Sequence, residues 1–394
     1  MSRRSRQTYD REIAGEAWDY HVTQARLRML DPQADIDRIA LHNGWMYDFY
    51  WYRAMIDMWL AGVIQPQWYL DVARRQATQF MKVATVSSGS PNTAPDGFQD
   101  WPHVYFIGQI RWAIQTARLC SDINHSSTTS IEEKAWATAT RIWLRRNITD
   151  KWAAKFFSVS TTQAHQCRGT ADSPPTRFWL DQIFLSMSYA MWMIANGDTN
   201  NTVDEVQDLF DLWTGRVEPV GNQVRTISGS PDRLEWDRDN PHFRDDEIIP
   251  DTSHAGAFAQ CVLIAHELGD YLFPPNFMQN MANTFSHYIY REGESYEGSN
   301  HVFSNFIDGT NETYDPSGRN FGPYENGRIY VQWSEFARGD ARMLAVLKEV
   351  HRENEAGLGY INGNRSHWGR SSIPATILYA QTNPLTWGEP CHRQ

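Results

Sequence analysis

Apolar and aromatic residues recur every three or four positions along much of the chain, which is the spacing of one face of an α-helix. In the first third this pattern predicts five consecutive helices, at residues 9–30, 36–61, 66–83, 104–121 and 131–146. Pro66 stands where a first-turn proline is tolerated, and Ser130 with Glu133 three residues later forms a capping box. The pattern therefore predicts helix after helix with well-marked starts.

The same spacing predicts seven further helices, at residues 177–195, 203–214, 254–268, 275–291, 329–338, 341–352 and 372–381. Alternation typical of strands is weak, and it predicts only a short hairpin near residues 221–234. No GxGxxG or GxxxxGK[ST] loop is present, which disfavours a doubly wound nucleotide-binding sheet. The predicted fold class is all-α with at most a small β-hairpin.

Long irregular segments separate these helices at residues 87–101, 158–176, 218–251 and 292–328. Their aromatic and histidine content favours packed loops that line a site. Paired helices can form a bundle, a solenoid or an (α/α) toroid, and the pattern alone does not separate these. The toroid, an incomplete barrel of helical hairpins, best explains the aromatic loops, because its inner-helix ends surround one cleft. We expect a single toroidal catalytic domain over residues 1–394.

Composition narrows the range of partners and cofactors. The chain has 394 residues, of which 41% are apolar, and a formal charge of −11. An acidic balance disfavours nucleic acid as a partner. The sequence contains no run of about 18 apolar residues, which is the length that would predict a membrane span. The four cysteines form no CxxC pair and the histidines form no tight triad in sequence, so no metal and no cofactor are expected; the alternative is that three distant histidines converge in the fold.

The densest group of polar and aromatic residues runs from residue 244 to residue 328, and it opens with Asp251-Thr-Ser-His254. Any of the first three residues can cap a helix that carries His254 in its first turn. The electropositive start of a helix favours a neutral imidazole and attracts a carboxylate. His254 is therefore a candidate partner for a uronate; the alternative is a plain capping segment with a partly buried surface histidine.

A glycine-punctuated loop further on presents Tyr296, Asn300 and His301. A tyrosine near Arg291 can act as a phenolate base, because the cation lowers the pKa of the hydroxyl. The alternative is a solvated loop with one aromatic anchor. Asp308 directly precedes a glycine, and we interpret it as a turn residue more than a catalytic one.

Two further stretches combine aromatic rings with polar groups, one around His42 and Asn43 and one at Trp101 and His103. Aromatic rings stack on the C–H faces of sugars, while Asn, His and Arg bind hydroxyls and carboxylates. This combination suits an oligosaccharide cleft, although most such rings also serve as core filling. No nucleophile elbow, HExxH helix or catalytic-thiol signature is present.

The aromatic helices, the Asp251-Thr-Ser-His254 helix start and the segments at residues 277–285 and 333–337 resemble α/α-toroid carbohydrate-active enzymes. The resemblance is to polysaccharide lyases that cut alginate or glucuronan. It implies β-elimination, in which a uronate carboxylate is neutralised, C5 loses its proton and the departing oxygen is protonated. Tyr296 would then be base, acid or both, and His254 a second base or carboxylate partner.

The resemblance also implies that Arg291, with Asn300 or Asn43, stabilises the negative charge of the intermediate. The implied substrate-binding residues are Asn43, His42, Trp101, His103, Asn300, His301 and Arg177. Several toroid lyases carry an Asn-His-Gly signature, whereas this chain has the order His42-Asn43-Gly44, which leaves open which residue neutralises the carboxylate.

The expected partner is an anionic polysaccharide, with no nucleic acid or membrane partner, for a monomer or small homo-oligomer. An acidic protein needs a locally positive cleft for such a polymer, with Arg177, Arg244, Arg291, Arg319 and Arg328 as candidates. The expected location is secreted or periplasmic, with the export signal removed.

Two alternatives stay open. A glycoside hydrolase on the same fold would use two carboxylates, either Asp251 with Asp181 or Asp100 with Glu335. The other alternative is a toroid that binds carbohydrate without catalysis.

Overall fold

The computed structural model describes residues 9–29, 49–86, 102–149, 224–227, 230–236, 249–268, 276–311, 321–356 and 366–387. The chain divides into two compact units. The first comprises Met1–Val83, Asp251–Gln260 and Pro275–Glu389, and the second comprises Ala84–Pro250, Cys261–Pro274 and Pro390–Gln394. The expected single catalytic domain stays a prediction. The helices predicted at 177–195 and 203–214 lie outside the described residues.

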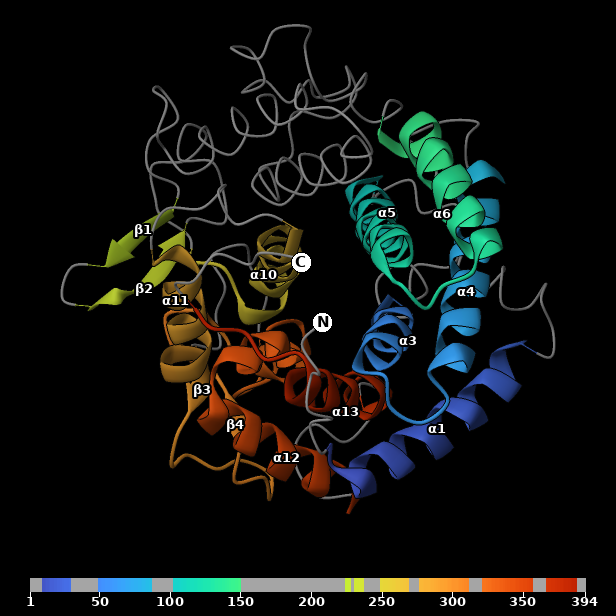
Figure 1. The fold of residues 1–394 in the computed structure, drawn as a ribbon. Coiled ribbons are helices and arrows are strands. Elements are labelled where there is room, and N and C mark those ends of the chain that lie inside the picture. Colours follow the sequence, from blue (N-terminus) through green and yellow to red (C-terminus); the bar gives the residue numbers. More distant parts are fainter. Residues whose placement is uncertain are drawn as a thin grey trace, which may run out of the picture. The chain divides into compact units, whose positions relative to one another are not determined.

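The described residues are mostly helical, which confirms the all-α class (Figure 1). The α-helices are α1 (Arg11–Met29), α3 (Phe49–Ala61), α4 (Pro66–Val86), α5 (Pro102–His125), α6 (Ile131–Leu144), α10 (Thr252–Leu268), α11 (Phe277–Asn283), α12 (Ala341–Glu355) and α13 (Ser366–Thr382). Shorter segments are the π-helices η3 (Arg145–Thr149) and η7 (Thr284–Ile289) and the 3₁₀ helices η8 (Asn326–Gln332) and η9 (Ser334–Gly339). The finer prediction of a toroid remains a prediction.

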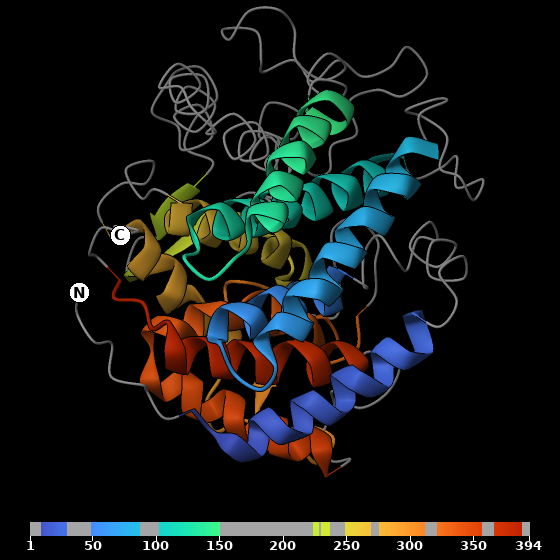
Figure 2. The ribbon, with the colours of Figure 1, turned by 45° about the vertical axis from the view of Figure 1, so that its right-hand side comes forward.

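Helix α3 lies in the core of the first unit. Its sequence is apolar on nearly every side and almost all of its residues are buried, as expected for a helix without a polar face. Helix α13 packs against α3, and both α1 and α12 pack against α13 (Figures 1 and 2). Two charged residues of α3, Arg53 and Asp57, are buried with the rest, and Arg53 forms ion pairs with Asp57 and with Glu335 of η9.

The predicted starts of α4 and α6 are confirmed. In α6, Ser130 accepts a hydrogen bond from the Glu133 backbone while the Glu133 side chain accepts one from the Ser130 backbone. This is the capping box read from the sequence. In the second unit, which contains α6, Cys120 is a buried free thiol, and burial raises its pKa.

Two short antiparallel sheets interrupt the helices. In the second unit β1 (Val224–Ile227) pairs with β2 (Ser230–Trp236), which confirms the hairpin predicted near residues 221–234. In the first unit β3 (Tyr290–Arg291) pairs with β4 (Val302–Phe303). This second sheet was not predicted, because strands of two residues are too short to show alternation.

Two predicted helices need correction. The helix expected over 275–291 is α11 followed by η7, and it gives way to β3 at Tyr290. The helix expected over 329–338 is split between the 3₁₀ segments η8 and η9. Long-range contacts explain the second change: the Tyr330 ring stacks on Phe303 at 3.8 Å, and the Trp333 indole N–H donates to the Thr252 carbonyl at 3.0 Å. Such contacts override local helix propensity.

Candidate functional site

The start of α10 is fixed by hydrogen bonds. Asp251 Oδ1 accepts from the backbone N–H of Ser253 at 3.1 Å and from its hydroxyl at 2.6 Å, so Asp251 caps the helix. The next residue, Thr252, donates its backbone N–H to the Asn305 carbonyl and its hydroxyl to the Ser304 carbonyl, both at 2.8 Å. The predicted capped start is confirmed. His254 lies in the first turn of this helix, but its side chain is outside the described part, so its chemistry stays a prediction.

The β3–β4 hairpin places the candidate residues that follow α11 on two opposite faces. Adjacent strand residues point to opposite faces, and accordingly Tyr290 is buried while Arg291 is partly exposed. On the Tyr290 face, the Tyr290 hydroxyl lies 3.1 Å from His301 Nδ1, and the Arg342 guanidinium lies over the Tyr290 ring. His301 is therefore bound on the face opposite to Arg291.

Asn300 is also bound away from Arg291. Its backbone N–H donates to Glu353 Oε1 at 3.1 Å, and the neighbouring Ser299 hydroxyl donates to Glu353 Oε2 at 2.6 Å. Glu353 thus holds the end of the turn in place through both carboxylate oxygens. The expected joint role of Arg291 with Asn300 or Asn43 in stabilising a charged intermediate stays a prediction.

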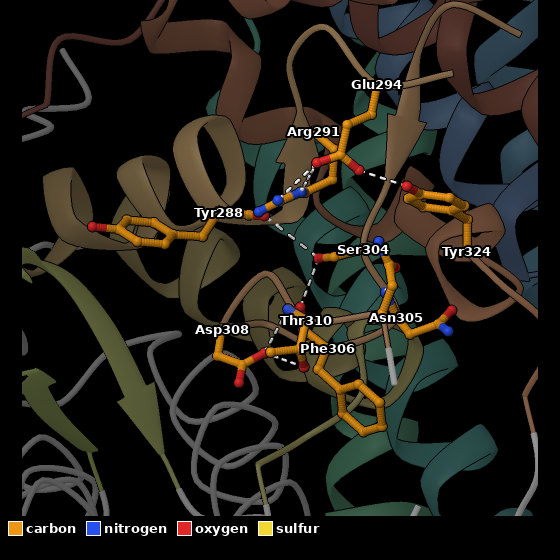
Figure 3. Close-up of polar contacts among 10 residues, drawn as sticks. Tyr288, Arg291, Glu294, Ser304, Asn305, Phe306, Asp308, Thr310 and Tyr324 are labelled. Atoms are coloured by element: carbon orange, nitrogen blue, oxygen red, sulfur yellow. Dashed lines mark hydrogen bonds and ion pairs between the residues drawn. The ribbon is translucent and has the colours of Figure 1, made fainter. Parts of the chain in front are cut away.

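A second, more exposed group lies on the other face, and we call Arg291, Glu294, Tyr296 and Tyr324 the Arg291 cluster; Figure 3 shows Arg291, Glu294 and Tyr324. Arg291 donates from Nε and Nη2 to Glu294 Oε1 at 2.9 and 2.7 Å. The Tyr324 hydroxyl donates to Glu294 Oε2 at 2.5 Å. The centroids of the Tyr296 and Tyr324 rings lie 5.4 Å apart. One guanidinium, one carboxylate and two phenol rings are therefore held together at the surface.

The guanidinium of Arg291 is not fully used by these contacts. The side chains of Arg291 and Glu294 are 34% and 35% exposed. Within the described part of the chain, Nη1 of Arg291 forms no hydrogen bond. Nη1 lies against Gly309, where a Cβ would come within 2.9 Å of it. Arg291 is thus anchored by one side of its guanidinium and retains a donor on the other.

Two tight turns present the tyrosines of the cluster. Tyr296 and Ser299 exchange both backbone hydrogen bonds, and the residues between them, Glu297 and Gly298, have φ of 50° and 85°. Positive φ at both central positions is typical of a type I′ turn. Gly298 suits this positive φ because it has no Cβ. Glu297 occupies a position where type I′ turns prefer asparagine, aspartate or glycine.

The second turn spans residues 322–325, and the Glu325 N–H donates to the Gly322 carbonyl at 3.0 Å. Pro323 occupies the position that type II turns favour for proline, and Tyr324 follows with φ of 56°, where such turns normally require glycine or asparagine. Holding a bulky residue in this region costs about 1–3 kcal/mol. Contacts of the Tyr324 side chain must offset that strain.

The pKa shifts describe how protons are held in the cluster. Burial raises the pKa of Tyr324, and its hydrogen bond to the Glu294 carboxylate raises it further. Burial also raises the pKa of Glu294, but the hydrogen bonds from Tyr324 and Arg291 and the charge of Arg291 outweigh it, so the net pKa is lowered. Tyr324 is therefore a neutral donor to an ionised carboxylate, and it is poorly suited to act as a base.

The loop beneath the cluster is held by short-range hydrogen bonds. Asp308 Oδ1 accepts from the Thr310 N–H at 2.9 Å and from its hydroxyl at 2.8 Å (Figure 3). Gly309, between them, has φ of 90°. The Ser304 hydroxyl donates to the Phe306 carbonyl at 2.7 Å. Asp308 has the turn contacts that the sequence predicted for it.

The other predicted site residues fall outside what the structure describes. Asn43, His42, Trp101 and Arg177 lie outside the described residues, and His103 lies in α5 with its side chain undescribed. Three contributors were missed from the sequence: Glu294, Tyr324 and Glu353. The spacing of Arg291 and Glu294 by three residues and the Gly322-Pro323 pair were signals that could have identified the first two.

The structure also bears on the carboxylates proposed for a hydrolase. Asp251 is fully buried at the start of α10, and Glu335 is buried in an ion pair with Arg53. Each of the two carboxylate pairs considered for hydrolysis includes one of these residues. Asp251 is engaged in capping α10 and Glu335 in its ion pair with Arg53, so both carboxylates have structural roles.

No protein family, no curated protein and no solved structure matches the chain. In the described ranges, no three His, Cys, Asp or Glu side chains gather closely enough to hold a metal ion. Nor does any helix within those ranges have the length and apolar character needed to cross a membrane. A functional inference for this chain therefore depends on the geometry of the Arg291 cluster.

Proposed function

We propose that this chain is a polysaccharide lyase that cleaves a uronate polymer by β-elimination, with the described helices forming part of an α/α toroid. The observation that carries the proposal is the Arg291 cluster, in which a half-anchored guanidinium lies beside two tyrosine rings on a partly exposed surface. An arginine suits a carboxylate, because its N–H groups match the carboxylate oxygens. Tyrosine rings suit the faces of sugars.

In the proposed reaction, Nη1 of Arg291 binds the uronate carboxylate and stabilises the charge that develops when C5 loses its proton. The C5–H electron pair becomes the C4=C5 double bond, and the C4–O bond breaks with its electron pair on the departing oxygen. The Tyr296 phenolate takes the C5 proton and returns it to that oxygen, so no water is consumed. Tyr296 has this role rather than Tyr324, whose hydroxyl is committed to Glu294.

The hydrolase alternative has less support from this geometry. Hydrolysis of a glycosidic bond needs two accessible carboxylates on either side of it. Asp251 caps α10 and Glu335 is buried against Arg53, so neither carboxylate pair named for hydrolysis is complete in an accessible form. Elimination needs a cation and a proton-transfer group, and the Arg291 cluster contains both.

The test is ultraviolet absorbance at the band of an unsaturated uronate. The protein is incubated separately with polymannuronate, polyguluronate, glucuronan and glycosaminoglycans. A rise with one polymer supports elimination and names the substrate. New reducing ends without a rise in absorbance indicate a hydrolase, and binding without either product indicates a non-catalytic carbohydrate-binding protein; both outcomes contradict the proposal.

Two variants test the assigned roles on the polymer that responds. Tyr296→Phe deletes one hydroxyl and is expected to abolish elimination while the circular dichroism spectrum stays unchanged, whereas normal turnover removes Tyr296 from the mechanism. His254→Ala tests whether this histidine is a second base: a loss of turnover of about a hundredfold or more would add it to the mechanism, whereas unchanged turnover leaves Tyr296 as the proton carrier. The matched control is Tyr9→Phe, because the Tyr9 hydroxyl lies outside the cluster and has no hydrogen bond among the described residues.

A further inference from the structure

We propose that Tyr324 is a positioning residue, held in a strained turn so that its hydroxyl fixes Glu294 and Glu294 in turn fixes Arg291. The inference rests on the proposed function, in which Arg291 binds the uronate carboxylate. Tyr324 itself does not touch the reacting atoms in this proposal. Its role is to set the direction of the guanidinium.

A chain of contacts connects Tyr324 to Arg291. Glu294 uses one oxygen for Arg291 and the other for Tyr324, so its carboxylate is oriented from both sides. A carboxylate held at both oxygens cannot rotate, and the guanidinium bound to it is held in one orientation. With Nε and Nη2 fixed in this way, Nη1 is held against Gly309.

The turn that carries Tyr324 is itself anchored. The Gly322 carbonyl accepts from Asn305 Nδ2 at 3.1 Å, and the Gly322 N–H donates to Glu325 Oε2 at 2.8 Å. The turn is therefore bound to the loop that also contacts the start of α10. Within this anchored turn, glycine would suit the backbone at position 324 better than tyrosine, since φ is 56°. Strain retained at one residue of a partly exposed polar cluster points to a requirement for its side chain.

The competing explanation is that Tyr324 only packs against Tyr296 and stabilises the fold. The two explanations predict different effects of relieving the strain. A packing role makes stability and activity fall together when the side chain is removed. A positioning role separates them, because removing the side chain relaxes the backbone while it releases Glu294 and Arg291.

The first experiment compares Tyr324→Gly with Tyr324→Ala in urea unfolding and in turnover. Glycine tolerates the turn conformation, so Tyr324→Gly is expected to unfold at a higher urea concentration than Tyr324→Ala, while kcat/KM falls at least tenfold in both. The matched control is Gln65, an exposed residue with φ of 51° before α4. Gln65→Gly and Gln65→Ala are expected to show the same stability order with unchanged kcat/KM. Normal turnover in Tyr324→Gly overturns the inference.

The second experiment uses Tyr324→Phe, which keeps the ring and deletes the hydroxyl. The hydrogen bond from Tyr324 lowers the pKa of Glu294. Its loss is expected to shift the acid limb of the kcat/KM profile to higher pH and to lower kcat/KM about tenfold. A change in packing alone leaves the limb in place, so an unshifted limb contradicts the inference. Tyr9→Phe again serves as the control.

A third readout does not depend on turnover. In protein labelled with ¹⁵N-arginine, the Nε–H signal of Arg291 is assigned by its disappearance in Arg291→Lys. Its exchange with solvent is expected to be slow in the wild type and faster in Tyr324→Phe, because Glu294 is then free to rotate. Equal exchange in both overturns the inference. If no polymer yields an unsaturated product, the proposed function fails, but this exchange measurement still decides whether Tyr324 positions Arg291.

Discussion

Two arginine–carboxylate clusters in the first unit have similar chemistry but very different surroundings. In one, Arg53 of α3 is paired with Asp57 and Glu335, and the three side chains are 1%, 2% and 3% exposed. In the other, Arg291 and Glu294 are each about one-third exposed. The first cluster connects α3 to η9 inside the core, whereas the second lies beside turns at the surface.

The difference shows which cluster can take part in binding. Ion pairs removed from water must keep their partners, because an isolated buried charge is far more costly than a paired one. A partly exposed arginine can accept a ligand carboxylate as an additional partner, since solvent already screens its charge. The Arg53 cluster is therefore structural, and the Arg291 cluster is the candidate site.

The largest expected effect comes from breaking the buried cluster. Arg53→Ala leaves Asp57 and Glu335 buried without their main cation, and it is expected to reduce the free energy of unfolding by about 3–5 kcal/mol. The measurement is urea unfolding followed by circular dichroism.

Arg291→Ala is the matched control for this loss. Removal of a partly exposed arginine is expected to cost less than about 1 kcal/mol, because surface ion pairs contribute little. If the variant Arg53→Ala is too unstable to purify, Glu335→Gln is measured instead, since it keeps the shape of the side chain and removes one charge. Equal losses at Arg53 and Arg291 would contradict the distinction between the two clusters.

A smaller effect is expected from crowding the guanidinium of Arg291. Gly309→Ala places a methyl group 2.9 Å from Nη1 of Arg291 and 3.1 Å from the Tyr288 carbonyl, at φ of 90°. The positive φ alone costs about 1–2 kcal/mol for a residue with a Cβ. The contact adds to this cost and is also expected to lower turnover on the uronate polymer.

Gly293→Ala separates these two contributions. Gly293 has φ of 80°, but a Cβ there meets no atom within 4 Å. It is therefore expected to lose stability from strain alone and to keep its turnover. If urea unfolding and initial rates give the same values for both variants, the close approach of Gly309 to Arg291 has no consequence for the cluster.

The sequence predicted the helices well because their signals are local. The repeat of apolar residues in 49–61 and the capping box at Ser130 are contained within one helix or its first turn. The end of the segment at 275–291 was wrong for the opposite reason. Tyr290 and Arg291 continue the apolar and polar pattern of the preceding helix, but their pairing with Phe303 and Val302 depends on residues more than ten positions away.

The candidate site was predictable only in part, on the same physical grounds. Arg291 and Tyr296 were identified because a cation and a phenol lie close in sequence. Tyr324 was not, because its contact with Glu294 spans 30 residues and its backbone conformation contradicts the preference of the position for glycine. Sequence rules describe preferred conformations, so they fail where a residue is kept in a disfavoured one.

The smallest expected effect is a pH-dependent change in stability, and it distinguishes the Arg291–Glu294 ion pair from an ordinary exposed ion pair. The folded-state pKa of Glu294 is lowered from its usual value of 4.5. A group of this kind stabilises the folded state above its unfolded pKa, and the contribution is lost as the pH falls through the folded pKa. Glu294→Gln is therefore expected to be less stable than the wild type at neutral pH, by no more than about 1 kcal/mol because the pair is partly exposed.

The two proteins should converge in stability once the pH falls below the folded-state pKa of Glu294, where protonated Glu294 resembles glutamine, and urea unfolding at a series of pH values measures this. The control is Glu349→Gln, which removes the exposed ion pair with Arg352 in α12, where both side chains are more than half exposed. That pair has no tyrosine donor, so its removal is expected to change stability less at neutral pH. A difference between wild type and Glu294→Gln that stays constant with pH would mean that Arg291 and Tyr324 do not hold the ionised carboxylate. Glu294 could then not connect the strained turn at Tyr324 to the guanidinium of Arg291.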